Sequence, residues 1–352
     1  MFCQIIPNDV LMKVYEYTGD TDKLKLLQNI QESIQHRYQR SVIYDNRETF
    51  IPALLDWLQT GKERLWFYDC KHRTEFPNKP EIKKEQEHDE DEPDPHRQIV
   101  PQTHISNMDE TYDFFRDVYG RLSFDDRSAT VKFYSNYGLD YDNAFWDGKQ
   151  MVFGTGGKYF NDFGSILDIV GHEFTHAVIQ YTSDLNYHGQ PGALNEHVSD
   201  VFGSLIKQYL QHQTTDQANW LIGEGLWDKS LPSSFVSLRS MKEPGTGFPG
   251  DMQPDHMIDL YTGPEDNGGV HVNSGIPNKA FYLAATELGG YAWDRLGLVW
   301  FETVKDRKMI RQTSNFEAFA RTTVVKAAQI YPPHISNEAA IIQDAWQQVG
   351  VL

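Results

Sequence analysis

Three residues near the middle of the chain have the types and spacing of a metal site: His172, Glu173 and His176. Histidines at positions i and i+4 of a helix lie one turn apart on the same face, so both imidazoles can reach one ion. Glu173, next to the first histidine, can then hold a water molecule at that ion. The order His-Glu-x-x-His is typical of zinc sites on helices. On its own, however, the pattern also fits two surface histidines on an ordinary helix.

A third ligand is available in the next helical stretch, Gly192 to Asp200, where Glu196 offers a carboxylate oxygen. Two imidazoles and one carboxylate leave the fourth zinc position open for water, which is the layout of a catalytic site and not of a structural one. Asp200, one turn after Glu196, is expected to accept the free N–H of a ligand imidazole, and Asn195 is assigned a supporting contact of the same kind. His188 and His197 flank these segments and are expected at the surface.

The composition agrees with a site made of histidine and carboxylate. The chain of 352 residues has only two cysteines, Cys3 and Cys70, which excludes a disulfide-rich scaffold and a zinc ribbon. Its 50 acidic and 32 basic side chains give a formal net charge of −18, which repels nucleic acids and anionic membranes. No apolar run approaches the roughly 18 residues of a membrane helix. We therefore expect neither nucleic acid nor membrane as a partner.

The first residues, Met1 to Asp9, lack the basic region of a secretory signal peptide, and Pro7 interrupts their apolar stretch. This pattern predicts a protein that is cytoplasmic at synthesis, and it leaves open a later release by a leaderless route.

The elements that must position the metal ligands follow from the spacing of apolar residues. Residues 1–40 are predicted to be helical, with an apolar stripe at Val10, Leu11, Val14 and Tyr15. Strands are predicted at 129–135 and 150–154, and a helix at 108–122. From residue 165 onward the pattern is strongly helical, and Ser314 to Glu317 has the form of a capping box. The acidic segment 81–95 is predicted to be a solvated loop.

Four further stretches, taken with the metal segments, make the sequence similar to the zinc endopeptidases of the thermolysin family. They are Asn143–Gly148, Ser237–Met241 and Asp266–Gly275, together with Tyr187 between the two metal segments. The similarity extends from about residue 41 to the C-terminus. The first 40 residues resemble the short propeptide of the protealysin-like branch of that family, through Ile5-Ile6-Pro7 and through Ser41–Asp45 at the expected mature start.

The resemblance implies an α+β fold with the zinc site in a cleft between two domains. The expected division is a helical propeptide at 1–40, a β-rich N-terminal catalytic domain at 41–164 and a mainly helical C-terminal domain at 165–352. Peptide and protein substrates are implied, and we expect a monomer.

The same resemblance assigns roles to site residues. Glu173 is implied as general base, Tyr187 and His271 as donors to the developing oxyanion, and Asp266 as the residue that orients His271. Substrate-binding residues fall into two groups, with Asn143, Ala144 and Arg239 contacting the peptide backbone and Phe160, Phe163, Ile169 and Leu238 lining an apolar pocket. Such a pocket implies cleavage on the amino side of hydrophobic residues.

Calcium is where the sequence departs from the thermolysin pattern. Asp168 and Glu224 match calcium ligands of the family, whereas Lys207, Asn219 and Leu221 replace residues of its double calcium site. The resemblance therefore implies zinc and one calcium ion near Asp168 and Glu224, with the Lys207 ammonium replacing the charge of the second ion.

The N-terminal element suggests a self-processed proenzyme in which the segment from Ile5 to Leu11 covers the cleft until the chain is cut near Arg40. A zinc-bound thiolate from Cys3 is an alternative means of inhibition. Two other hypotheses stay open: an uncut chain that acts as a binding or regulatory protein through its N-terminal hairpin, and an aminopeptidase with the same zinc motif.

Overall fold

The computed structural model describes residues 3–19, 25, 64–85, 100–334 and 336–352. Outside these residues lie the predicted processing site near Arg40, the Ser41–Asp45 stretch, the second half of the predicted N-terminal hairpin and most of the acidic segment 81–95. The described start of that segment is not the predicted loop, because Ile82–Glu85 is a strand. Among the described helices, none is long and apolar enough to cross a membrane.

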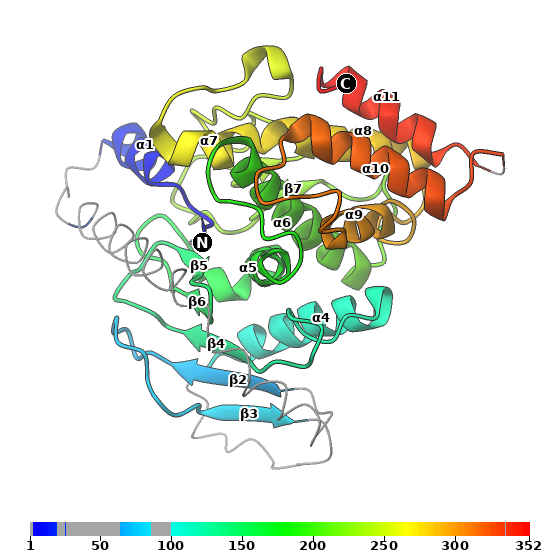
Figure 1. Ribbon diagram of the computed structural model, residues 1–352. Coiled ribbons are helices and arrows are strands. Elements are labelled where there is room, and N and C mark those ends of the chain that lie inside the picture. Colours follow the sequence, from blue (N-terminus) through cyan, green and yellow to red (C-terminus); the bar gives the residue numbers. More distant parts are fainter. Residues whose placement is uncertain (1–2, 20–24, 26–63, 86–99, 335) are drawn as a thin grey trace.

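A six-stranded sheet forms the first half of the described chain, with the strand order β1-β5-β6-β4-β2-β3 (Figure 1). The strands are β1 (Cys3–Gln4), β2 (Arg64–Asp69), β3 (Ile82–Glu85), β4 (Val131–Ser135), β5 (Ala144–Trp146) and β6 (Met151–Phe153). The β2–β4 and β4–β6 pairs are parallel and the others antiparallel. The predicted strands at 129–135 and 150–154 are confirmed as β4 and β6.

Helix α4 (Gln102–Tyr119) packs between this sheet and helix α5 (Leu167–Gln180). Phe115 of α4 lies 5.3 Å from Phe174 of α5, and His104 lies 5.7 Å from Phe133 of β4, measured between ring centroids. The helix begins six residues before the predicted start at 108, directly after Pro101, whose fixed φ suits a helix N-terminus.

The rest of the chain is mainly helical, as predicted. Its further helices are α6 (Gly189–Leu210), α7 (Glu265–Asn273), α8 (Gly275–Leu288), α9 (Leu296–Lys305), α10 (Phe316–Ile330) and α11 (Glu338–Gln348), and its strands are β7 (Leu221–Ile222) and β8 (Arg239–Ser240). The described chain is thus α+β, with the sheet in the first half and the helices in the second.

The N-cap of α10 differs from the predicted capping box. Asn315, and not Ser314, accepts a hydrogen bond from the Ala318 N–H at 3.0 Å. The Ser314 hydroxyl instead accepts from the backbone N–H of Arg311 at 2.8 Å. Asn is as good an N-cap as Ser, so the sequence offered two adjacent starts.

Two glycines bring α5 and α6 into close contact. A Cβ at Gly203 would lie 2.4 Å from the backbone oxygen of Asp168, and one at Gly171 would lie 2.6 Å from the Ile206 side chain. A larger residue at Gly203 would push the helices apart because it meets backbone, whereas one at Gly171 would first displace the end of the Ile206 side chain. These helices carry the predicted metal ligands, so their spacing sets the geometry of the site.

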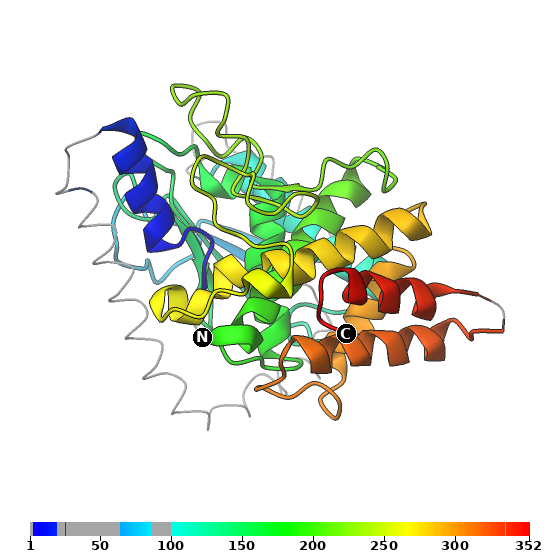
Figure 2. The same cartoon turned by 90° about the horizontal axis from the view of Figure 1, so that it is seen from above.

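The N-terminal segment is a strand followed by a helix, which corrects the prediction of a wholly helical element. Strand β1 pairs with β5 in antiparallel fashion, and α1 (Asn8–Thr18) follows on the side of the molecule where α7 lies (Figures 1 and 2). The predicted apolar stripe of α1 is confirmed, because Val10, Leu11, Val14 and Tyr15 are all buried.

Candidate active site

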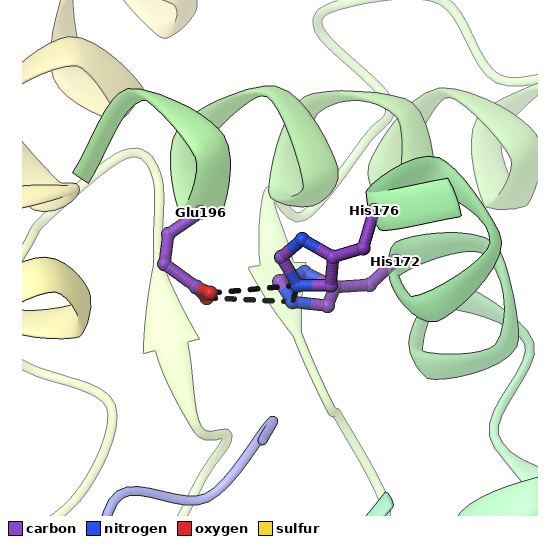
Figure 3. A group of neighbouring side chains, drawn as sticks. All are labelled: His172, His176 and Glu196. Carbon is purple, nitrogen blue, oxygen red and sulfur yellow. Dashed lines mark hydrogen bonds and ion pairs between the residues drawn. The ribbon is translucent and has the colours of Figure 1, made fainter. Parts of the chain in front are cut away.

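Helices α5 and α6 bring the three predicted metal ligands together, as Figure 3 shows. The Nε2 atoms of His172 and His176 lie 2.9 Å apart, and each lies 3.4 Å from a carboxylate oxygen of Glu196. All three side chains are buried. They form the single group of three or more metal-binding side chains among the described residues.

Hydrogen bonds to the other ring nitrogens fix both histidine tautomers. His172 Nδ1 donates to Asp200 Oδ1 at 2.9 Å, and His176 Nδ1 donates to Asn195 Oδ1 at 2.8 Å. Carboxylate and amide oxygens only accept, so the protons sit on Nδ1 and both Nε2 lone pairs face the same point. Glu196 Oε2 is buried there with no hydrogen-bond donor. This donor set of two nitrogens and a carboxylate fits zinc.

Asp200 also binds Arg239, a contact that the sequence did not predict. Arg239 Nη2 donates to Asp200 Oδ1 at 2.7 Å and Nε donates to Oδ2 at 2.8 Å. Burial alone would raise the pKa of Asp200, but the Arg239 charge and the bond from His172 hold it well below its usual value. Asp200 therefore stays ionised beside the metal ligand.

Asn278 is a supporting residue that the sequence analysis missed. It donates to Asp200 Oδ2 at 2.9 Å and accepts from His197 Nδ1 at 2.8 Å. The surface placement expected for His197 is wrong, because its ring is fully buried and its Nε2 accepts from the Trp300 indole. Burial lowers the pKa of His197 to about 4. Neither Asn278 nor Trp300 is near His197 in sequence, so no local sequence pattern could predict these contacts.

Glu173, the predicted general base, is oriented by strand β5. Its Oε2 accepts a hydrogen bond from the Trp146 backbone N–H at 2.7 Å, and its Oε1 is buried without a donor. Burial raises the pKa of Glu173, and the positive charge of a zinc ion at the neighbouring ligands would favour the ionised form that can accept a proton.

His271 and Tyr187 both lie next to the metal ligand Glu196. His271 Nδ1 donates to Asp266 Oδ1 at 2.6 Å, and its Nε2 lies 3.2 Å from the Tyr187 hydroxyl, which itself donates to Glu196. Burial would lower the pKa of His271, but the charges of Glu196 and Asp266 raise it to about 9. The predicted pairing of Asp266 with His271 is thus present.

A tight left-handed turn makes this pairing possible. Asp266 and Asn267 have φ of 53° and 51°, and Gly268 and Gly269 continue in the same region. The turn folds the Asp266 carboxylate back onto the start of the next helical turn, where its Oδ2 accepts from the His271 backbone N–H at 2.7 Å. One carboxylate therefore fixes both the backbone and the ring of His271.

The residues predicted to bind substrate backbone contact the N-terminal segment of the same chain. Asn143 Nδ2 donates to the Ile6 carbonyl at 2.8 Å, and the Ile6 N–H donates to Asn143 Oδ1 at 3.0 Å. Arg239 Nη1 donates to the Ile5 carbonyl at 3.2 Å. The start of the predicted inhibitory segment, Ile5 to Leu11, therefore lies in the predicted cleft. The Cys3 side chain is not among the described ones, so the thiolate alternative stays a hypothesis.

The four predicted pocket residues are all buried, but they do not all line one cavity. Leu238 borders a small, partly open cavity that Ile5, Val272 and Phe248 also line. Phe160, Phe163 and Ile169 belong to the surrounding hydrophobic core and are absent from the cavity wall. Of the four, only Leu238 is thus placed against the cavity beside the N-terminal segment.

The predicted calcium ligands are engaged by groups of the chain itself. Asp168 Oδ2 accepts from the Lys207 ammonium at 2.6 Å, and Oδ1 accepts from the Gly223 N–H at 3.2 Å. Lys207 also donates to the Leu221 carbonyl at 2.7 Å. Glu224 is exposed and accepts from the Asn219 amide. The geometry agrees with the predicted replacement of one ion by Lys207, while the single calcium ion stays a prediction.

Comparison with known proteins gives one consistent result. Residues 60–180 match the thermolysin metallopeptidase catalytic domain, and residues 183–351 match the thermolysin metallopeptidase alpha-helical domain. The chain is 38% identical to the protease PrtS of Photorhabdus sp. (strain Az29), over 99% of this chain and 91% of that protein. It is equally identical to an extracellular metalloprotease of Pectobacterium carotovorum subsp. carotovorum, over 99% of this chain and 96% of the relative.

Thermolysin itself is matched over a smaller share. A thermolysin of Bacillus caldolyticus is 39% identical over 68% of this chain and 43% of its own length. Among solved structures, the precursor of protealysin, a metalloproteinase from Serratia proteamaculans, is similar with a TM-score of 0.75 and 44% identity. That similarity covers 84% of this chain and 89% of the precursor.

Proposed function

Because the chain belongs to the thermolysin family of zinc metalloendopeptidases, in its protealysin-like branch, we propose that the residues of this site hydrolyse peptide bonds on the amino side of hydrophobic residues. The observation that carries the proposal is the backbone of Gln4 to Ile6, whose polar groups meet Asn143, Arg239 and His271. The backbone of a peptide substrate offers the same carbonyl and N–H groups, so these side chains bind it in the same way.

The reaction depends on a division of roles among buried groups. Zinc held by His172, His176 and Glu196 supplies a Lewis acid that activates water and polarises the substrate carbonyl. Glu173 accepts the proton of the attacking water and gives it to the nitrogen that leaves. Its contact with the Trp146 N–H holds one carboxylate oxygen, so the other can take the proton.

Tyr187 and His271 stabilise the negative charge that develops on the carbonyl oxygen. Both ring nitrogens of His271 face oxygen acceptors, namely Asp266 Oδ1 at 2.6 Å and the Gln4 carbonyl at 2.6 Å. A carboxylate and a carbonyl oxygen only accept hydrogen bonds, so both ring nitrogens of His271 carry protons in this arrangement and donate to them. Asp266 therefore keeps the ring both charged and aimed at the substrate carbonyl.

The preference for a hydrophobic residue follows from the surroundings of Ile5. Ile5 is fully buried against the cavity that Leu238 borders. A substrate side chain at this position would lie among apolar groups, where each buried CH₂ contributes about 0.8 kcal/mol.

The contacts of residues 4–6 also support the proposal that the N-terminal segment inhibits the enzyme. A substrate cannot reach Asn143 and Arg239 while Ile5 and Ile6 occupy them. Full activity then requires removal of this segment, which we attribute to self-processing.

A substitution at Glu173 tests the mechanism. Glu173→Gln removes the proton acceptor but keeps the shape and the contact with Trp146, so we expect casein hydrolysis to fall by about 10²- to 10⁴-fold. Zinc content, measured by elemental analysis, should stay near one ion per chain, because Glu173 is not a ligand. A chelator should abolish activity of the unsubstituted enzyme.

Glu287→Gln, on the exposed side of α8, is the matched control and should leave activity unchanged. If the Glu173→Gln protein hydrolysed casein at the original rate, Glu173 would not be the base.

A further inference from the structure

Residues 4–6 enter the site with a fixed direction and register. Strand β1 runs antiparallel to β5, with Gln4 opposite Phe145, and the Ile5 N–H donates to the Ala144 carbonyl at 3.2 Å. After Ile5, the Ile6 backbone forms its pair of hydrogen bonds with the side chain of Asn143. A shift of the chain by one residue would break every one of these contacts, because each of them uses one particular backbone N–H or C=O group of Ile5 or Ile6.

In this register the Gln4 carbonyl is the one that meets the catalytic residues. His271 Nε2 lies 2.6 Å from it, while the next carbonyl, of Ile5, meets Arg239. The same His271 nitrogen lies 3.2 Å from the Tyr187 hydroxyl and 3.4 Å from Glu196 Oε2. The peptide bond between Gln4 and Ile5 therefore occupies the position of the bond that a substrate would present for hydrolysis.

The residue after this bond has the chemistry that the site prefers. The Ile5 side chain is apolar and has no exposed surface. Cleavage on the amino side of such a residue would break the bond between the Gln4 carbonyl carbon and the Ile5 nitrogen. The segment thus satisfies both the backbone and the side-chain requirements of a substrate.

We propose that the enzyme hydrolyses the Gln4–Ile5 bond of its own chain, an inference that rests on the proposed function. The oxygen of one water molecule bonds to the Gln4 carbonyl carbon, and the carbon–nitrogen bond to Ile5 breaks. The proton that Glu173 takes from the water passes to the Ile5 nitrogen, so a carboxyl group and an amine form without any redox partner.

Cleavage at this bond does not release α1. The buried face of α1 and the bond from the Lys13 ammonium to the Gly250 carbonyl, at 3.0 Å, lie after Ile5 in the chain. The shortened chain therefore keeps Ile5 and Ile6 tethered in the cleft. Loss of the first four residues and gain of activity on other substrates are separate events.

The experiment is a time course of the zinc-loaded full chain, followed by intact mass and N-terminal sequencing. We expect a chain that begins at Ile5 to form before casein hydrolysis appears. The rate should not change over a tenfold dilution, because the bond already lies in the site. The Glu173→Gln chain should stay intact at this bond, and Ile5→Asp should slow its cleavage at least tenfold, whereas Ile5→Leu should not.

A second readout does not depend on hydrolysis. In the Glu173→Gln chain, with or without zinc, the backbone N–H groups of Ile5 and Ile6 should exchange slowly with solvent, and Ile5→Asp should abolish that protection. Fast exchange of these N–H groups in the Glu173→Gln chain that keeps Ile5 would show that residues 4–6 do not bind in the proposed register.

The failure of this inference can be told from failure of the proposed function. If enzyme freed of α1 by limited trypsin digestion cleaves casein but no chain beginning at Ile5 ever forms, the inference is wrong and the function stands. A cleavage rate that rises with protein concentration would also contradict it. If the freed enzyme fails to cleave casein, the proposed function itself is wrong.

Discussion

Asp200 joins the metal site to the substrate-binding site through a single carboxylate. Its Oδ1 accepts from both His172 and Arg239, and its Oδ2 accepts from Arg239 and Asn278. The residue that fixes the tautomer of a zinc ligand therefore also aims the arginine that binds a peptide carbonyl. Buried charges are stable only when they are paired and hydrogen-bonded in this way.

Asn143 provides a test of backbone recognition by one residue. In enzyme freed of its N-terminal segment, Asn143→Ala removes both an acceptor and a donor for the substrate backbone. At about 0.5–1.5 kcal/mol for each hydrogen bond, kcat/KM should fall roughly 5- to 150-fold. Steady-state hydrolysis of a short peptide measures this. Asn186→Ala, at an exposed position, is the control, and an unchanged kcat/KM for Asn143→Ala would refute the role.

The sequence predicted the zinc ligands well because His172 and His176 lie one helical turn apart and Glu196 lies on the next helix. His172 and His176 share a helix face, and Asp200 lies one turn after Glu196, so local geometry was sufficient. The contact between Asp200 and Arg239 spans 39 residues, and no spacing rule reaches that far. Asn278 was missed for the same reason.

Helices α5 and α6 form one unit, in which glycines set the distance and a lysine balances the charge. Gly171 and Gly203 allow the close approach, and Asp168 at the start of α5 meets Lys207 near the end of α6. The helices themselves follow from apolar periodicity. The close contact between the two helices could not be predicted, because a glycine within a helix does not indicate which other element will pack against it.

Lys207→Met tests this pairing. It leaves the buried Asp168 carboxylate without its cation, and the loss of one partner of such a pair costs about 3 kcal/mol of unfolding free energy. Urea denaturation in the Glu173→Gln background, which prevents self-digestion, measures the change. We expect millimolar calcium to restore part of the loss in this variant, since a divalent ion can then bind the freed oxygens.

Lys305→Met is the matched control, because Lys305 pairs with Glu302 on an exposed helix face. That surface pair should contribute less than about 1 kcal/mol. Equal stability of the Lys207→Met and Lys305→Met proteins would show that Asp168 does not need the Lys207 charge.

The whole molecule is built so that its first residues complete the sheet that a substrate would extend. The sequence predicted that the N-terminal segment covers the cleft, and it predicted the buried stripe of α1. It did not predict strand β1, because two residues are too few for a pattern of alternation. What makes them a strand is the unpaired edge of β5, a feature of the folded enzyme and not of the segment.

The proposed inhibition by the N-terminal segment depends on how firmly α1 is held. Tyr15 packs edge-to-face on Tyr159 and Tyr17 on Phe235, with ring centroids 5.4 Å and 5.2 Å apart. Val14, next to Tyr15, is also buried. The apolar contacts of α1 keep residues 4–6 in place through the covalent link at Pro7. A weaker α1 contact should therefore open the cleft without any cut in the chain.

Val14→Asp places a charge in this apolar contact at a cost of about 3 kcal/mol, which shifts the ratio of closed to open chains roughly hundredfold. We expect the uncut Val14→Asp chain to hydrolyse a short fluorogenic peptide at least tenfold faster than the unsubstituted chain during the first minutes, with intact mass confirming that no cleavage has occurred. Met12→Asp, on the exposed side of the same helix, should behave like the unsubstituted chain. An uncut Val14→Asp chain that stays as inactive as the original would mean that strand β1, and not α1, holds the cleft closed.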